Sequence, residues 1–400
     1  MVSVCQLLKN KYFWITIVIL IPLLIISLFL TFGSFDEPSV EDVYVGVSAA
    51  YDNVEEIKLF VDEVSFYINT IVIGSTGITF DVAKLDGVCQ YVYDKGLYFM
   101  IYAHPINDIA ELAIQCQWVL DAKPRWGKQF LGLYAIDEPG GRQLDNASLT
   151  VVKDEDWFAD NYDNYTDAAD KYVNETFIYL HHLIEDQMCG LDLTLYTSDY
   201  ALYWFDYKAH FDVVFAEFGW NYSRHLNVAL CRGAANVQNR EWGVMITWTY
   251  TYPPPRETYL ESGEELYDDL VLAYDSGADY ILVFDTNENY THKTLNSDHL
   301  DALKRFWRYA GHNPRASAPA PDRVAYVLPK GYGYGFRGPN DTIWGLWEAD
   351  DFSLEISTEV GGLIDEYQNR LDIIYHDGLE TNSSYGYSEL IFWNGTVWVP

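Results

Sequence analysis

Residues 130–141 have the sequence FLGLYAIDEPGG, in which a short apolar run ends abruptly in two acidic residues, a proline and two glycines. An apolar run of this length is typical of a parallel strand that is covered on both faces. Similar runs recur from residue 43 onward, and helical patterns separate them. The predicted strands are Val43–Ala50, Tyr67–Gly74, Leu97–Ala103, Phe130–Ile136, Leu193–Thr197, Val213–Ala216, Gly243–Trp248 and Tyr280–Phe284.

The segments between these strands have the period of amphipathic helices. Between Asp52 and Phe66, for example, an apolar stripe is formed by Val54, Ile57, Phe60, Val61 and Val64. Such a stripe is the face by which a helix packs on a core. Eight strand–helix units within about 270 residues match the size of a closed barrel. We therefore predict an α/β fold, a (β/α)8 TIM barrel, with a doubly wound open sheet as the alternative.

The chain after the barrel starts with a stretch typical of a stiff linker, PRASAPAP at residues 314–321. The predicted organisation is a barrel domain over residues 43–312, a linker over 313–322 and a small α/β domain over 323–400. In the small domain a helix is expected to start at Ser353, a good N-cap residue. Its predicted strands are Val324–Leu328, Leu371–Tyr375 and Leu390–Trp393.

The N-terminal residues 12–32 form an apolar run without a charged residue, long enough to span a bilayer as a helix. Lys9 and Lys11 precede the run, and four acidic residues follow it. The positive-inside rule then predicts a cytoplasmic tail at residues 1–11 and a single-pass transmembrane anchor at residues 12–32. Everything after a linker at residues 33–42 is expected outside the cytoplasm. A cleaved signal peptide is the alternative, although the run is long for one.

The amino-acid composition limits which kinds of partner the protein can bind. Of 400 residues, 59 are Asp or Glu and 25 are Lys or Arg, which gives a formal net charge of −34. A surface this acidic repels nucleic acid and anionic lipid head groups, so neither is expected as a partner. Cys89 and Cys116 fall on consecutive predicted helices, where they either pair or remain buried thiols. A glycoprotein at the cell surface agrees with eight N-x-[ST] sequons, at Asn146, Asn164, Asn174, Asn221, Asn289, Asn340, Asn382 and Asn394.

Polar and aromatic residues follow six of the predicted strands. In a (β/α)8 barrel, functional groups lie at the C-terminal ends of the strands and on the loops that follow. These positions therefore give the candidate site residues: His104, Asp137, Glu138, Asp199, Tyr200, Glu217, Trp220, Trp248, Tyr250, Asp285 and Asn287. Period-two alternation predicts that Asp137 and Glu138 point to opposite sides.

Two of these strand ends carry a family resemblance. The segment LYAIDEP at residues 133–139 resembles the acid/base strand of barrel glycoside hydrolases, in which a Glu often precedes Pro. The segment AEFGW at residues 216–220 resembles their nucleophile strand, and Trp248 resembles the aromatic residue that floors the sugar subsite. The resemblance covers residues 43–312. It implies that Glu138 is the acid/base and Glu217 the nucleophile or base, with the other candidate residues binding substrate.

There is one departure from the family pattern. Glu217 ends the sixth predicted strand, whereas the large retaining clan places its nucleophile on the seventh. Either the strand count is off by one, or the family is a different one.

The predicted function is a membrane-anchored, extracytoplasmic glycoside hydrolase that acts on poly- or oligosaccharide through Glu138 and Glu217. Glycoside hydrolysis needs two carboxyl groups, one to protonate the leaving oxygen and one to attack the anomeric carbon or activate water. The alternative is a barrel that binds glycan without cleaving it, or a structural protein of the cell envelope, because a fold does not fix a function.

No cofactor and no catalytic metal are predicted. Gly333, Gly335 and Gly338 satisfy the pattern G-x-G-x-x-G. A dinucleotide site needs a helix to open at the third glycine, and here Pro339 follows it instead. No zinc-ligand spacing such as H-E-x-x-H occurs in the chain.

Overall fold

The structure is a computed structural model that describes residues 40, 42–103, 109–145, 162–181, 193–251, 258–287, 289–315, 322–380 and 386–399. The predicted anchor at residues 12–32 and the candidate residue His104 lie outside the described residues. Within the described ranges, no helix combines the length and the apolar composition that crossing a membrane would require.

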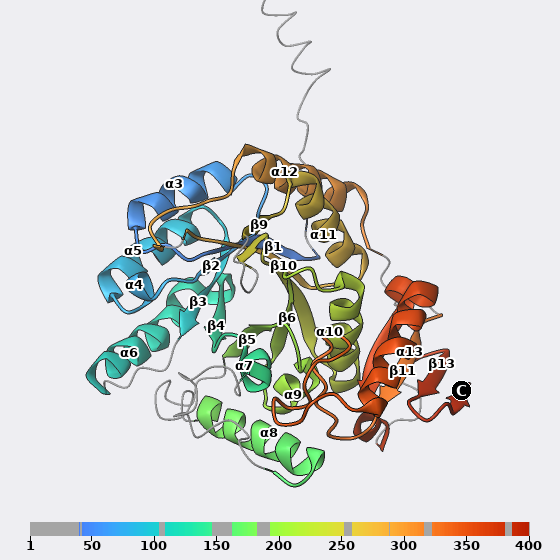
Figure 1. The fold of residues 1–400 in the computed structure, drawn as a ribbon. Coiled ribbons are helices and arrows are strands. Elements are labelled where there is room, and N and C mark those ends of the chain that lie inside the picture. The colour runs from blue at the N-terminus through green and yellow to red at the C-terminus, as the bar shows by residue number, and fades with distance from the viewer. Residues whose placement is uncertain are drawn as a thin grey trace, which may run out of the picture.

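Eight parallel strands form a closed barrel, which confirms the predicted fold class and excludes an open sheet. The circle closes between the last strand and the first, where Tyr44 pairs with Tyr280. Figure 1 shows the ring of strands inside a ring of helices. In order along the chain, the barrel strands are β1 (Tyr44–Ala49), β2 (Thr70–Ile73), β3 (Tyr98–Ala103), β4 (Phe130–Ala135), β5 (Thr194–Asp199), β6 (Val213–Phe218), β7 (Glu241–Ile246) and β10 (Tyr280–Asp285).

The helices cover the outside of the barrel with their apolar faces. In α3, Asn53 caps the N-terminus through its side chain, and the predicted stripe is buried at Ile57, Phe60, Val61 and Val64. The barrel-side helices are α3 (Val54–Val64), α4 (Thr76–Thr79), α5 (Val82–Asp94), α6 (Ile109–Trp126), α7 (Pro139–Asp145), α8 (Tyr165–His181), α9 (Tyr203–Lys208), α10 (Arg224–Gln238), α11 (Gly263–Asp275) and α12 (Ser297–His312). A short hairpin that the sequence did not predict joins β8 (Thr249–Thr251) to β9 (Thr258–Leu260).

The interior of the barrel is filled by side chains. Gly243 is needed there, because a Cβ atom at this position would lie 2.7 Å from the ring of Phe215. The interior cluster comprises Val72, Met100, Tyr134, Tyr196, Val213, Phe215, Met245, Tyr280 and Leu282. A ligand can therefore enter only at a mouth of the barrel.

The C-terminal residues form a second, smaller sheet with strand order β12-β11-β13-β14. Its elements are β11 (Val324–Leu328), α13 (Asp351–Tyr367), β12 (Leu371–Tyr375), β13 (Glu389–Phe392) and β14 (Val397–Trp398). The predicted cap of α13 is wrong by three residues: Asp350 is the N-cap, and Ser353 is its partner in a capping box. The three predicted strands of this unit are confirmed as β11, β12 and β13, and β14 was not predicted.

A buried ion pair joins the small sheet to the barrel, and Figure 1 shows the two side by side at α10. Arg232 on α10 donates to Asp372 on β12 at 2.7 Å and to the Leu371 carbonyl at 2.9 Å. Asn236 and Tyr387 donate to the same carboxylate at 3.0 and 2.7 Å. Arg232 therefore fixes the contact between the two units.

The cysteine positions resolve one of the alternatives. Cys89 is a free thiol on α5 and is fully buried, so the Cys89–Cys116 bridge does not form. Burial raises the pKa of the Cys89 thiol well above its usual value. This residue is a small apolar core side chain.

Candidate active site

A cavity of about 410 Å³ opens at the C-terminal mouth of the barrel. All eight barrel strands, or the loops that follow them, contribute to its wall. The lining residues are Ser48, Ala50, Asp52, Gly74, Ser75, Thr76, Tyr102, Tyr134, Asp137, Glu138, Ser198, Glu217, Trp220, Met245, Thr247, Phe284 and Tyr290. Both predicted catalytic residues belong to this wall.

The turn after β4 aims Glu138 into the cavity. Ile136 and Glu138 both have φ of 55°, in the left-handed region that side chains with a Cβ atom rarely adopt. The backbone N–H of Glu138 donates to the Ser198 carbonyl at 2.9 Å, and the Thr197 hydroxyl donates to the Ile136 carbonyl at 2.9 Å. These bonds to β5 hold the unusual turn. Because the turn breaks strand alternation, Asp137 and Glu138 both line the cavity, and the prediction that they point apart is wrong.

Asp199 fixes the same turn from behind. Its carboxylate accepts the backbone N–H groups of Gly140 at 2.5 Å and Gly141 at 2.9 Å, and those of Tyr200 and Ala201 at 2.8 and 3.1 Å. Burial raises the pKa of Asp199 to about 7, against the opposing effect of these four donors. A Cβ atom at position 141 would lie 2.1 Å from the Tyr200 ring, which explains why glycine stands there.

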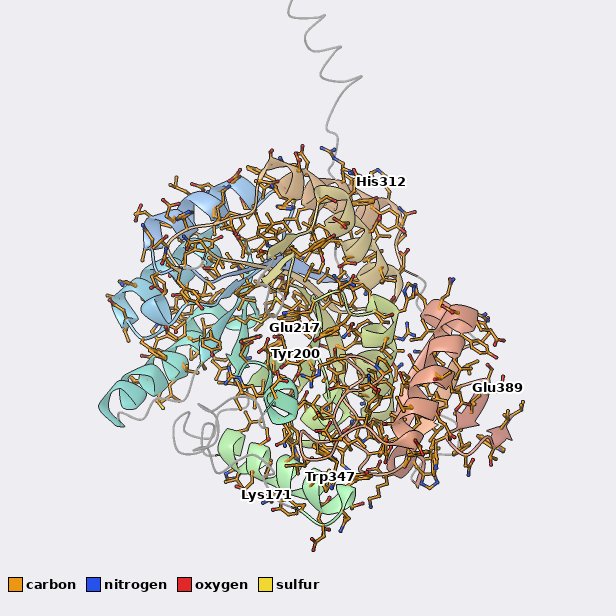
Figure 2. All side chains as sticks on the ribbon, viewed as in Figure 1. Lys171, Tyr200, Glu217, His312, Trp347 and Glu389 are labelled. Atoms are coloured by element: carbon orange, nitrogen blue, oxygen red, sulfur yellow. The ribbon has the colours of Figure 1, made fainter. Side chains whose placement is uncertain are left out.

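Glu217 lies on β6, near the middle of the barrel in Figure 2, and only 4% of it is exposed. The Ser198 hydroxyl donates to its Oε1 at 2.5 Å. Burial raises the pKa of Glu217 well above its usual range, and the charges of Glu138 and Asp137 raise it further.

Glu138 and Glu217 both line the cavity, and each acts on the pKa of the other. Burial, followed by the charges of Asp137 and Asp199, raises the pKa of Glu138 to about 8, against the opposing effect of Glu217. Two buried carboxyl groups that act on each other repel when both are ionised, so the pair retains at least one proton. The pair can therefore offer one proton donor and one anion in the same cavity.

The rest of the wall combines rings with hydroxyl-binding groups. Tyr102, Trp220, Phe284 and Tyr290 supply aromatic surface, which suits the apolar face of a sugar ring. The groups that can bind sugar hydroxyls are polar side chains of the same wall: Ser48, Asp52, Ser75, Thr76 and Thr247. Among the described residues that line the cavity there are four carboxyl groups and no Lys, Arg or His. A neutral or cationic ligand suits this wall, and an anion does not.

Several candidate residues lie near this mouth but do not line the cavity. Asp199 and Tyr200 hold the turn after Glu138, and the Tyr200 hydroxyl donates to Asp145 at 2.7 Å. Asn287 accepts the N–H of Thr291 at 2.8 Å within its own loop.

Asp285 and Trp248 are both buried. The two oxygens of Asp285 accept the Tyr51 hydroxyl at 2.7 Å and the Thr294 N–H at 2.9 Å. Trp248 donates to the Phe284 carbonyl at 2.9 Å and packs on His299. The side chain of Tyr250 lies outside the described part of the chain, as does all of His104.

The sequence missed Tyr102, Tyr134 and Ser198, which lie among the carboxyl groups. Their only sequence signal was position, because each stands on a predicted strand, or just after one, close to a strand end. The described residues contain no cluster of three or more His, Cys, Asp or Glu side chains suited to a metal ion.

No family model and no curated protein matches the chain. Similar solved structures include alpha-L-fucosidase isoenzyme 2 from Paenibacillus thiaminolyticus, with 12% identity and a TM-score of 0.49 over 87% of this chain. The chain spans 59% of the length of that fucosidase. A family 1 beta-glucosidase from Thermotoga maritima has 8% identity and a TM-score of 0.38, with 68% of this chain and 97% of the other covered. An endo-1,4-beta-xylanase from Penicillium canescens has 11% identity and a TM-score of 0.38, with 65% of this chain and 94% of the other covered. The closed barrel of eight parallel strands, which the resemblance implied, is shown by the strand pairing itself.

Proposed function

We propose that the protein is a glycoside hydrolase whose catalytic pair is Glu138 and Glu217. The observation that carries this proposal is that both carboxyl groups line one cavity at the mouth of a (β/α)8 barrel and act on each other's pKa. A pair with one proton supplies both the acid and the anion that cleavage of a glycosidic bond requires. The aromatic wall supports a sugar as the ligand.

We propose that the anomeric configuration is retained. Inverting enzymes keep their carboxyl groups about 6.5–9.5 Å apart to admit water, whereas retaining enzymes keep them about 5–5.5 Å apart. The interaction between the Glu138 and Glu217 side chains favours the shorter of these two separations. We assign the nucleophile to Glu217, which Ser198 holds at the buried end of the pair. We assign the acid/base to Glu138, on the turn after β4.

The reaction then proceeds in two balanced steps. Glu217 attacks the anomeric carbon and forms a glycosyl ester, while the Glu138 proton moves to the leaving oxygen and the glycosidic bond breaks. Water next attacks the same carbon and gives a proton to Glu138, and the ester bond to Glu217 breaks. Both carboxyl groups return to their starting protonation.

The charge of the cavity favours neutral poly- or oligosaccharides as substrates. A sugar that carries a carboxylate or phosphate would meet four carboxyl groups and no basic side chain among the described lining residues.

A matched pair of chromogenic substrates tests the activity. We expect hydrolysis from a panel of 4-nitrophenyl glycosides of neutral sugars, with the first product released in the starting anomeric configuration as followed by ¹H NMR. The glucuronide, which differs from the glucoside by one carboxylate, is expected to be a poor substrate. Release of the inverted anomer would contradict the two-step mechanism. Glycan binding by calorimetry without any cleavage would instead support a non-catalytic binding barrel.

We also propose that residues 12–32 anchor the protein in the cell membrane, with the barrel and small domain outside the cytoplasm. The charge asymmetry around this run supports the orientation. The sequon asparagines that the structure describes, Asn164, Asn174, Asn221, Asn289, Asn340 and Asn394, are all exposed, which supports a glycosylated exterior domain.

Protease protection tests this topology. Protease added to intact cells that express the full chain is expected to digest residues 43–400, as followed with an antibody against the small domain. A cytoplasmic marker protein in the same cells should survive. A protected small domain would overturn the proposed orientation.

A further inference from the structure

A row of four oxygen atoms connects Asp137 to Glu217. Tyr134 Oη donates to Asp137 Oδ1 at 2.6 Å and lies 2.6 Å from Ser198 Oγ. Ser198 Oγ in turn lies 2.5 Å from Glu217 Oε1. The row thus has three short contacts with a carboxyl group at each end. Ser198 Oγ also lies 3.3 Å from Asp137 Oδ1, and this longer contact gives a second route that omits Tyr134.

Counting protons shows what this row requires. Each of the three short contacts needs one proton between its two oxygens, and the two hydroxyl groups supply only two. The third proton must come from one of the two carboxyl groups. The pair of Glu138 and Glu217 also retains at least one proton. Both conditions are met when Asp137, Glu138 and Glu217 together hold two protons and one negative charge.

We propose that Asp137, Tyr134, Ser198 and Glu217 form a proton relay in which Asp137 takes up the proton that Glu217 must lose to act as nucleophile. Glu217 passes its proton to Ser198, Ser198 passes its own to Tyr134, and Tyr134 passes its own to Asp137. Each oxygen in the middle gains and loses one proton, so the net change is one proton moved from Glu217 to Asp137. In this relay Asp137 is a positioning residue, because it sets the charge of Glu217 through Tyr134 and Ser198.

Three members of the row are buried, and Asp137 is half-buried in the cavity wall. Glu217 is 4% exposed, Ser198 1% and Tyr134 7%. Burial raises the pKa of the Tyr134 hydroxyl well above its usual range, and Asp137 and Glu217 raise it further. Tyr134 therefore passes protons on and does not keep a charge. Short hydrogen bonds to a charged oxygen are also the strong ones, which stabilises the row as a unit.

The other ionisable groups around the row are few. The charges of Glu138, Asp137 and Asp199 raise the pKa of Glu217. The charge of Asp137 raises the pKa of both Tyr102 and Glu138, and Arg142 lowers both. Arg142 therefore opposes part of the repulsion among these carboxyl groups.

Titration of the carboxyl carbons tests the relay without relying on activity. The full chain is labelled with ¹³C at the Asp and Glu carboxyl carbons, and Asp137→Asn and Glu217→Gln variants assign the two signals. We expect both signals in the unmodified protein to change over the same pH intervals, because coupled groups titrate as a pair. Ser198→Ala cuts both routes, so it should separate the two curves. Tyr134→Phe cuts only the route through Tyr134 and should separate them less.

Tyr196→Phe is the matched control. Tyr134 and Tyr196 both stack on Phe215, at centroid distances of 6.2 and 5.7 Å, but the Tyr196 hydroxyl contacts Tyr280 and not the carboxyl groups. Its removal should leave both titration curves unchanged.

The role of the relay in turnover rests on the proposed function, whereas the shared proton does not. If Ser198→Ala and Tyr134→Phe change the Asp137 titration curve no more than Tyr196→Phe does, the relay is wrong, even if the protein is an active hydrolase. If the curves separate as expected in a protein that cleaves no glycoside, the relay stands and the proposed function fails. In an active enzyme, Ser198→Ala should also move the acid limb of the pH profile of kcat/KM, and Tyr196→Phe should not.

Discussion

Glu217→Gln is expected to lower kcat/KM by at least about 10²-fold on every glycoside that the protein cleaves, whatever the leaving group. An amide in place of the carboxylate cannot form the glycosyl ester, and it leaves the charge of the developing oxocarbenium ion without a partner. Glu138→Gln is expected to cause a similar loss on alkyl glycosides. Because only its protonating role is lost, activated aryl glycosides with good leaving groups should recover a large part of the first step.

A series of aryl glycosides of increasing leaving-group acidity separates these two roles. The slope of log kcat/KM against leaving-group pKa should steepen for Glu138→Gln and remain as in the unmodified protein for Glu217→Gln. Glu241→Gln is a suitable control, because Glu241 is exposed at the start of β7, at the opposite end of the barrel. Full activity of both site variants on a confirmed substrate would show that the chemistry lies elsewhere.

The free energy of unfolding is expected to fall by several kcal/mol as the pH rises from about 5.5 to 7.5. Burial raises the pKa of Glu138 and Glu261 to about 8 and that of Asp199 to about 7, and it raises those of Glu217 and Asp206 as well. Such carboxyl groups bind more protons in the folded state than in the unfolded state. Stability is therefore full below the unfolded pKa of about 4 and is lost as the pH rises through the folded pKa.

The expected slope is about 1.4 kcal/mol per pH unit for each proton taken up on folding. The net charge of −34 acts in the same direction, since deprotonation adds repulsion. Urea unfolding at three pH values in this range measures the effect. Glu138→Gln and Glu261→Gln should each flatten the dependence, whereas Glu241→Gln should not. A stability that rises with pH would mean that these carboxyl groups are ionised in the folded protein.

The sequence was sufficient for the architecture. A parallel strand covered on both faces must be apolar along its length, and a covering helix must have an apolar stripe, so both are visible as local patterns. The eight barrel strands and their order follow from these patterns, as do β11, β12 and β13. Strand ends were also visible, since an apolar run stops where Asp, Glu, Pro or Gly begins. That placed Glu138 and Glu217 at the same mouth of the barrel, with Glu217 on the sixth strand.

Which residues at that mouth face the cavity was decided by the tertiary structure. Two left-handed residues, Ile136 and Glu138, turn Asp137 and Glu138 to the same side, and hydrogen bonds from β5 hold them there. Alternation along one strand carries no information about such a turn. Asp199 follows the same local pattern as Glu217, yet four backbone N–H groups around the turn occupy it.

The contacts that give the site its chemistry join residues far apart in the chain. Ser198 and Glu217 are 19 residues apart, and Tyr134 and Ser198 are 64 apart. The same holds for Arg232 and Asp372, which are 140 apart. A local pattern reports burial and periodicity, which each segment carries in its own composition. A hydrogen bond between segments depends on the register and separation of neighbouring strands, and these are set only when the barrel closes.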